Sequence, residues 1–308
     1  MVIPDARIDD LTLPLGFKFD ALIPEGLSRE NVQLVKTNNS RRARESPDME
    51  ERILDYFVKT AGANSFNSPR ARFEGVSQVG QDLLIMYSED WYATHFFTRN
   101  TVLPRERKGD PLSINGLLLT RDNGLPYGLR NPQTTDQGKT YHIVPAGFTD
   151  ISPITEGPME TALRKMLDEI GFRGTYVTEN PHRATEREFN EELLLKGRSR
   201  GIETDSMRVI AVIYNSRKNF DTTMATTIPT SAYASQINLN GDEHTQLEFV
   251  DVAQSSLTNL LFDLSLAPDT NSGHFRGDIA ALIAHRFGLG AMTDSLNEVH
   301  TRLALYQR

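Results

Sequence analysis

Three glutamates stand close together in one predicted helix of this chain. Glu188, Glu191 and Glu192 lie in the stretch "ATEREFNEELLL" at residues 184–195. Because residues three and four apart are neighbours on a helix, their carboxylates fall within an arc of about 100°. Such a cluster is repulsive, and a hard divalent cation, which prefers carboxylate oxygens, would compensate its charge. A Mg²⁺ held in this way could bridge phosphate oxygens of a substrate and activate a water molecule.

The same helix can also bury an apolar side. Phe189 and Leu193 are four residues apart and occupy the arc beside the carboxylates, so both can enter a core. Arg187 precedes Glu191 by four residues and can pair with it. The alternative to a metal site is an acidic, solvent-exposed helix that Arg187 and Lys196 stabilise.

The elements around this helix alternate between strands and helices. Short strands and a helix are predicted in residues 1–110, and the polar, proline-broken stretch at 104–113 marks a boundary. Beyond it we predict strands up to residue 150, an Asn123-Gly124 hairpin turn, and two helices at 157–170 and 181–195. Further strands and a helical tail follow.

This order of elements predicts a mixed α/β fold built from short strands and hairpins. We divide the chain into an N-terminal α/β region at 1–110, a core at 111–265 and a C-terminal helical segment at 266–308. The core contains an inserted helix at about 151–178.

Composition narrows the class of protein. A net charge of −8 argues against a protein that wraps nucleic acid or binds an anionic membrane, since either partner requires a basic surface. The absence of cysteine excludes disulfides, thiolate metal sites and a cysteine nucleophile. No secretory signal is recognisable at the start, and no apolar stretch is long enough to span a bilayer. We therefore expect a soluble cytoplasmic protein.

A longer pattern surrounds the glutamates. Glu179 is followed by seven residues and then by Arg-Glu-Phe-Asn-Glu-Glu at 187–192, and "HIVPAGFTD" with Gly147 lies upstream. This pattern resembles the signature of the Nudix hydrolase superfamily, in which a glycine, a glutamate and an Arg-Glu-x-x-Glu-Glu segment follow one another. The resemblance covers roughly residues 112–263. It implies a Nudix-type mixed-sheet α/β/α sandwich, to which the N-terminal α/β region and the C-terminal helices are additions.

The chain departs from that signature in three ways. Between Gly147 and Glu179 there are 31 residues where the family has five, which requires an insertion of 26. The glycine expected after Glu192 and one further residue is Leu194, and the usual Gly-Gly pair is Ala146-Gly147.

A second register is also open. Residues 156–172 fit the same spacing with only three extra residues after Gly147, and Gly171 stands at the position of the final glycine. However, Lys165 stands where the catalytic glutamate belongs. We interpret that stretch as the inserted amphipathic helix, because its apolar residues form a complete helical stripe.

The resemblance implies roles for individual residues. Glu188, Glu191 and Glu192 would bind Mg²⁺ or Mn²⁺, a backbone carbonyl at Gly147 would add a ligand, and Glu243 from a late loop would add another. Glu188 would also be catalytic, Arg187 would orient a carboxylate, and Glu179 would pair with Arg187 or reach the metal through water. The alternative for Glu243 is a plain turn residue beside Gly241.

Substrate contacts are expected from outside the helix. Trp91 and Tyr92, in the aromatic stretch at 89–97, could stack a nucleobase, and Arg130 is a further substrate-binding candidate. The alternative for the aromatic stretch is core or interdomain packing.

Two functions follow from the resemblance. One is a metal-dependent hydrolase that splits a nucleoside diphosphate linked to another group, such as a nucleotide sugar. The other is a non-catalytic Nudix-like sensor that binds a nucleotide and regulates a partner. Dimers are common in the superfamily, which leaves a homodimer open.

Overall fold

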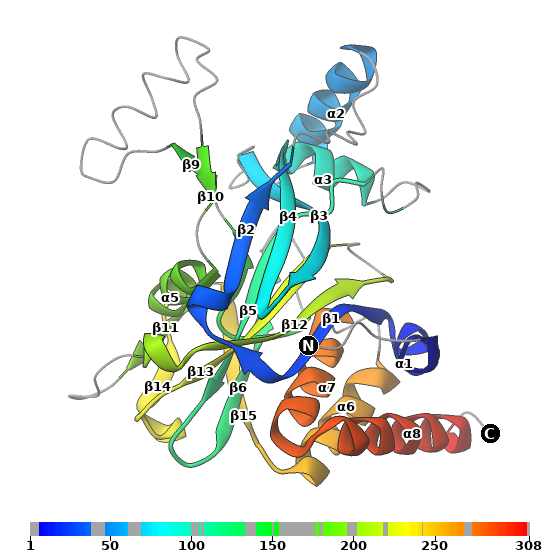
Figure 1. Cartoon of the computed structure of the whole chain (residues 1–308), viewed down its shortest axis with the longest axis vertical. Coiled ribbons are helices and arrows are strands. Elements are labelled where there is room, and N and C mark those ends of the chain that lie inside the picture. The colour runs from blue at the N-terminus through cyan, green and yellow to red at the C-terminus, as the bar shows by residue number, and fades with distance from the viewer. Residues whose placement is uncertain are drawn as a thin grey trace.

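The described part of the chain is a mixed α/β structure, which confirms the predicted class (Figure 1). This computed structural model describes residues 6–37, 47–60, 69–99, 105, 108–132, 140–149, 151–153, 176–178, 181–195, 202–217, 221–241, 243–267 and 273–306. The rival register at 156–172, Glu179 and the helix expected at 157–170 lie outside these residues.

A five-stranded sheet forms the centre of the fold, in the order β1-β12-β13-β5-β8. Its strands are β1 (Phe17–Leu27), β12 (Arg208–Asn215), β13 (Thr222–Pro229), β5 (Leu112–Leu119) and β8 (Ala146–Phe148). β13 and β5 are parallel, and the other neighbouring pairs are antiparallel. The valine and isoleucine run of β12 suits a strand that is buried on both faces. β1, which lies within the predicted region 1–110, is therefore part of the same sheet as the later strands.

Three C-terminal helices cover one face of this central sheet. They are α6 (Gln254–Leu266), α7 (Gly273–Phe287) and α8 (Leu289–Tyr306), drawn in orange to red in Figure 1. α7 is the innermost and packs against β1 and β12. Its Gly277 lies so close to Ile213 and Phe17 that a Cβ atom would overlap Ile213. The predicted C-terminal helical segment thus supplies a large part of the main core.

The other face is covered by N-terminal elements and by the glutamate helix. A second sheet has the order β2-β4-β3, with β2 (Val32–Lys36), β3 (Pro69–Val79) and β4 (Asp82–Trp91). Its buried side chains share a core with Ile114 and Val212 of the central sheet and with Ala184 of the glutamate helix α5 (Pro181–Glu192). α2 (Pro47–Thr60) and α3 (Tyr92–Thr98) pack together beside this sheet, and α1 (Ala6–Thr12) contacts α8.

A third sheet, β15-β6-β7, completes the framework near the site. Its strands are β6 (Gly124–Arg130), β7 (Tyr141–Ile143) and β15 (His244–Asp251). The Asn123-Gly124 turn exists, and Asn123 has a positive φ of 65°. However, the two strands that it joins do not form a hairpin ladder, because β5 pairs in the central sheet and β6 pairs with β15 and β7.

The glutamate helix is shorter than predicted. It begins at Pro181 and ends at Glu192. Proline is suited to the first helical position, because the N–H that it lacks would have no partner within the helix there. The next residues form β11 (Leu193–Leu195), which pairs with β14 (Ile237–Leu239). Within the predicted insertion, β9 (Ile151–Pro153) and β10 (Tyr176–Thr178) pair with each other. Leu194, which stands where the signature has a glycine, is therefore part of a strand that directly follows the helix.

Among the described helices, none is both long enough and apolar enough to cross a lipid bilayer.

Candidate active site

Two of the three clustered glutamates are buried together. Glu188 and Glu192 are four residues apart on α5, and their residues are only 7% and 2% exposed. They lie on the same helical line as the buried Thr185, while Glu191 lies on the other side of Glu188. The side chain of Glu191 is 58% exposed. The helix therefore turns two carboxylates toward the sheet and the third toward solvent.

The two buried carboxylates meet β8, the edge strand of the central sheet. The carboxylate of Glu188 lies against the Cα atom of Gly147, at the place where any other residue would carry its Cβ atom. The backbone N–H of Ala146 donates a hydrogen bond to Oε2 of Glu192, at 3.0 Å. The Ala146-Gly147 pair thus lets α5 approach the strand closely enough for both carboxylates to reach its backbone.

The register of β8 determines which of its backbone groups face the helix. The carbonyl oxygen of Pro145 accepts a hydrogen bond from the N–H of Gly116, the N–H of Thr149 donates to the carbonyl oxygen of Leu112, and Gly147 is the paired residue between them. In an antiparallel ladder the intervening residues, Ala146 and Phe148, turn their N–H and C=O groups away from the partner strand. Of the Ala146-Gly147 pair, where we expected a backbone ligand, Ala146 is therefore the residue whose carbonyl is turned away from β5 and toward the helix.

Arg187 connects the helix to the same strand. Its Nη1 donates to Oε1 of Glu188 at 2.6 Å and to Oε2 of Glu191 at 3.4 Å. Its Nη2 donates to the carbonyl oxygen of Phe148 at 3.0 Å. The guanidinium thus lies between two carboxylates and fastens α5 to β8.

Arg130 brings a second cation to the glutamate pair. It ends β6, its side chain is mostly buried, and it forms an ion pair with Glu243. Burial lowers the pKa of Arg130 below its usual value, and the negative charges of Glu192 and Glu188 oppose that fall without cancelling it. Arg130 is therefore the residue that places positive charge beside both buried carboxylates.

Burial dominates the electrostatics of Glu192. Desolvation, followed by the negative charge of Glu188, raises its pKa to about 8. The hydrogen bond from Ala146 and the charge of Arg130 oppose that rise without cancelling it. One of its oxygens, Oε1, is buried and has no hydrogen-bond partner among the described residues. A cation at this place would favour the ionised carboxylate.

His244 faces that same oxygen. It begins β15, its side chain is 3% exposed, and its Nδ1 lies 4.0 Å from Oε1 of Glu192. Burial, together with the charge of Arg130, lowers the pKa of His244 to about 4, so the imidazole is neutral at pH 7. Gly128 of β6 leaves room for its ring, since a Cβ atom there would lie 2.8 Å from the imidazole Cδ2.

The donor set fits a divalent cation in part. Two buried carboxylates, one with an unsatisfied oxygen, and an outward carbonyl at Ala146 are oxygen ligands of the kind that Mg²⁺ and Mn²⁺ prefer. Within the described ranges, however, no three His, Asp or Glu side chains converge closely enough to hold a metal ion. Glu191 and Glu243 are instead paired with Arg187 and Arg130.

Of the two aromatic candidates, Tyr92 contacts β8 through the ring of Phe148. Tyr92 is buried and packs against Phe57, Phe96 and Phe148, with 5.8 Å between the ring centroids of Tyr92 and Phe148. Trp91 is 40% exposed. The surroundings of Tyr92 match the packing alternative, whereas base stacking by either residue remains a prediction.

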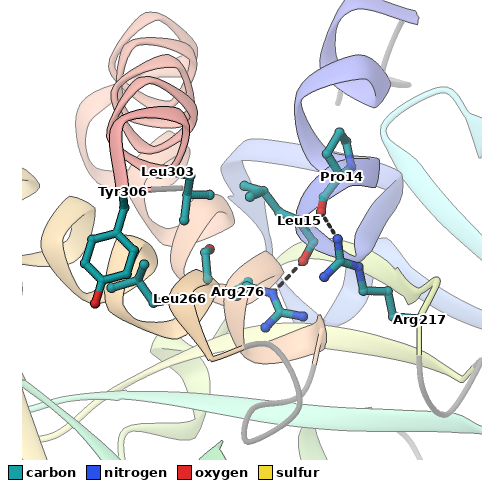
Figure 2. A pocket seen from close by; sticks show the side chains of 8 residues that line it. Pro14, Leu15, Arg217, Leu266, Arg276, Leu303 and Tyr306 are labelled. Atoms are coloured by element: carbon teal, nitrogen blue, oxygen red, sulfur yellow. Dashed lines mark hydrogen bonds between the residues drawn. The ribbon is translucent and has the colours of Figure 1, made fainter. Parts of the chain in front are cut away.

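A separate cavity of about 310 Å³ lies among α6, α7, α8 and the N-terminal segment (Figure 2). Arg276, which is fully buried, donates to the carbonyl oxygen of Leu15 at 2.5 Å, and Arg217 donates to that of Pro14. The two arginines thus fasten the segment before β1 to the helical layer. None of the predicted site residues lines this cavity.

The structure thus brings together Glu188, Glu192, Gly147, Arg187, Arg130 and Glu243. Sequence reasoning overlooked His244, although it directly follows Glu243. The available signal was weak, because a single histidine at the start of a strand is common and its contact with Glu192 depends on the pairing of β15 with β6.

Comparisons with known proteins give distant similarities. No protein-family model and no curated protein sequence match this chain. It is similar to a structure of a bifunctional NMN adenylyltransferase/ADP ribose pyrophosphatase from Francisella tularensis complexed with AMP and a Mn ion. That similarity has 12% identity and a TM-score of 0.32 and covers 56% of this chain and 41% of the other. A second structure of the same enzyme gives 11% identity, a TM-score of 0.34, and coverage of 62% and 44%. This chain spans less than half of those chains, and similarity at this level assigns neither a family nor a function.

Proposed function

We propose that this chain is a Nudix-type hydrolase that requires Mg²⁺ or Mn²⁺ and cleaves the diphosphate bond of a nucleoside diphosphate linked to another group, such as a nucleotide sugar. The observation that carries the proposal is the burial of Glu188 and Glu192 against the Ala146-Gly147 backbone. Burying two neighbouring carboxylates is costly, and a fold that needed only packing at this place would use apolar residues.

The residues would divide the work as follows. Glu188, Glu192 and the Ala146 carbonyl would hold the cation, which when bound supplies charge neutralisation on the diphosphate and a lowered pKa for a bound water. Arg130 would attract and orient the negatively charged diphosphate, since a buried guanidinium donates strong hydrogen bonds to phosphate oxygens. One of the two buried glutamates would accept the proton that the attacking water loses.

Arg187 would act indirectly. Its hydrogen bonds to Glu188 and to the Phe148 carbonyl keep the carboxylate over β8. Glu191 and Glu243 would then contribute through their pairs with Arg187 and Arg130, unless ligand binding frees them to reach the cation.

The second candidate is a nucleotide-binding sensor without catalysis. The observation that favours it is that no three acidic or histidine side chains converge within the described ranges. A sensor would bind its nucleotide unchanged, whereas a hydrolase would consume it.

The test is hydrolysis across a panel of nucleotide sugars, dinucleotides and nucleoside triphosphates, with and without Mg²⁺. Wild type would be compared with Glu192→Gln and with Glu191→Gln, a matched change on the exposed side of the same helix. We expect metal-dependent turnover that Glu192→Gln lowers by more than the roughly 10- to 100-fold typical of outer partners of a metal site. Glu191→Gln should have the smaller effect. Tight binding of one nucleotide without turnover would support the sensor.

A further inference from the structure

We propose that His244 is a positioning residue that holds Oε1 of Glu192 through its Nδ1. This inference deepens the proposed function, because it concerns the buried glutamate of the same site. It begins from two polar groups that face each other inside the protein.

The first group is the free oxygen of Glu192. Oε2 accepts the hydrogen bond from Ala146, but Oε1 is buried without a hydrogen-bond partner among the described residues. A buried carboxylate oxygen that accepts no hydrogen bond lowers the stability of the fold, so we expect a nearby group to donate to it. With only one oxygen fixed, the carboxylate could rotate away from the place that a cation needs.

The second group is the imidazole of His244. Its Nδ1 is 4.0 Å from Oε1, which is longer than a hydrogen bond by about 1 Å, so a small movement of either side chain would bring the two atoms within hydrogen-bond distance. The side chains on both sides of this gap are 3% and 2% exposed, so both groups lie largely away from bulk solvent. A neutral imidazole with its proton on Nδ1 can donate toward the carboxylate.

The ring is held in place by the strands around it. His244 pairs with Arg130 across the β15–β6 ladder, and its ring lies over Gly128 of the same strand β6. Carboxylates that bind a metal ion are commonly hydrogen-bonded by an outer partner, which fixes their orientation. Ala146 on one side and His244 on the other would therefore define the position of Glu192.

The decisive variants separate the two ring nitrogens. In His244→Asn the amide occupies approximately the place of Nδ1, in His244→Gln approximately that of Nε2, and His244→Leu removes both. His274→Asn is the matched control, because His274 is also a buried histidine but bonds the carbonyl oxygen of Asp221 beside α7. Mn²⁺ affinity, kcat and KM are measured for each variant.

We expect His244→Leu and His244→Gln to weaken Mn²⁺ binding and to lower kcat by about 10-fold or more, with less change in KM. His244→Asn should recover most of that loss, and His274→Asn should leave Mn²⁺ affinity unchanged. Equal behaviour of the Asn and Gln variants, or wild-type Mn²⁺ affinity in a folded His244→Leu protein, would overturn the inference. If His244→Leu does not fold, the comparison of Asn with Gln decides.

A double-mutant cycle separates this inference from the proposed function. Urea unfolding of metal-free protein is compared for His244→Asn, His244→Gln and Glu192→Gln, alone and combined. We expect His244→Gln and His244→Asn to differ in stability when Glu192 is present and to differ less in the Glu192→Gln background, since the negative charge that Nδ1 faces is then lost. Strictly additive effects would contradict the pairing. If wild type binds Mn²⁺ and shows this coupling but hydrolyses nothing, the proposed function fails and the inference stands.

Discussion

The Cα atom of Gly147 touches the carboxylate of Glu188, and a Cβ atom at that position would overlap it. The contact explains why a glycine stands in the middle of a three-residue edge strand. It also ties the sequence of β8 to the position of α5, since the helix can approach only as far as the side chains between them allow.

Replacing Gly147 should therefore move Glu188. In Gly147→Ala the new methyl group displaces the carboxylate, and we expect hydrolysis to fall by about 10-fold or more because a ligand is misplaced. The backbone of Gly147 does not require a positive φ, so the fold should survive. Gly290→Ala is the control, since nothing lies within 4 Å of its Cβ position. Wild-type activity in Gly147→Ala would show that Glu188 need not occupy this place.

Arg130 should matter for binding more than for the fold. Arg130→Met keeps much of the apolar stem and removes the charge beside Glu192 and Glu188. Because a hydrogen bond to a charged group contributes about 1.5–3 kcal/mol, we expect KM for the diphosphate substrate to rise about 10- to 100-fold. Steady-state kinetics would measure this, with Arg121→Met, whose guanidinium lies over the ring of Tyr233, as the control. An unchanged KM would exclude Arg130 from substrate contact.

Phe148 connects the N-terminal elements to the site strand. Its ring contacts Tyr92 and His95, and the guanidinium of Arg70 lies over it at 5.4 Å. We expect Phe148→Ala to lower the free energy of unfolding by about 2 kcal/mol, less than the loss for a fully buried phenylalanine because the ring is half-buried. Urea unfolding tests this against Phe287→Ala, which removes a 41% exposed ring. Equal losses in the two variants would mean that the contacts of Phe148 add no stability.

Asp278 of α7 should make stability depend on pH. It is fully buried, accepts a hydrogen bond from Asn115 at 2.5 Å, and burial raises its pKa to about 8. The unfolded chain loses this proton at a pH near 4, whereas the folded protein keeps it up to about pH 8. The stabilisation that this group contributes is therefore fully present below pH 4 and is lost as the pH rises to 8. The slope is at most about 1.4 kcal/mol per pH unit.

Asp278→Asn tests this dependence, because the amide can still accept from Asn115 and does not titrate. We expect its urea-unfolding free energy to vary less than that of wild type between pH 5 and pH 8, and Asp251→Asn, at an exposed site, to follow wild type. Parallel curves for wild type and Asp278→Asn would mean that this carboxyl does not control the pH dependence.

Much of the candidate site was predictable from local spacing. The four-residue interval between Glu188 and Glu192 puts both on one side of any helix, and Arg187 lies within reach of its neighbours for the same reason. The mixed α/β class follows similarly from short strands between helices. These features depend on residues close in the chain, so the periodicity of the backbone is enough to infer them.

Tertiary structure decided the rest. Glu191 belongs to the same helix face by spacing, yet β8 covers only Glu188 and Glu192, and Glu191 is left to solvent and Arg187. The helix ends at Glu192 because Leu193–Leu195 find a partner strand more than forty residues later. His244 reaches Glu192 only through the pairing of β15 with β6. The glutamates and their helical spacing were determined by the sequence itself, but which of them are buried together depended on contacts between distant segments, which no local pattern encodes.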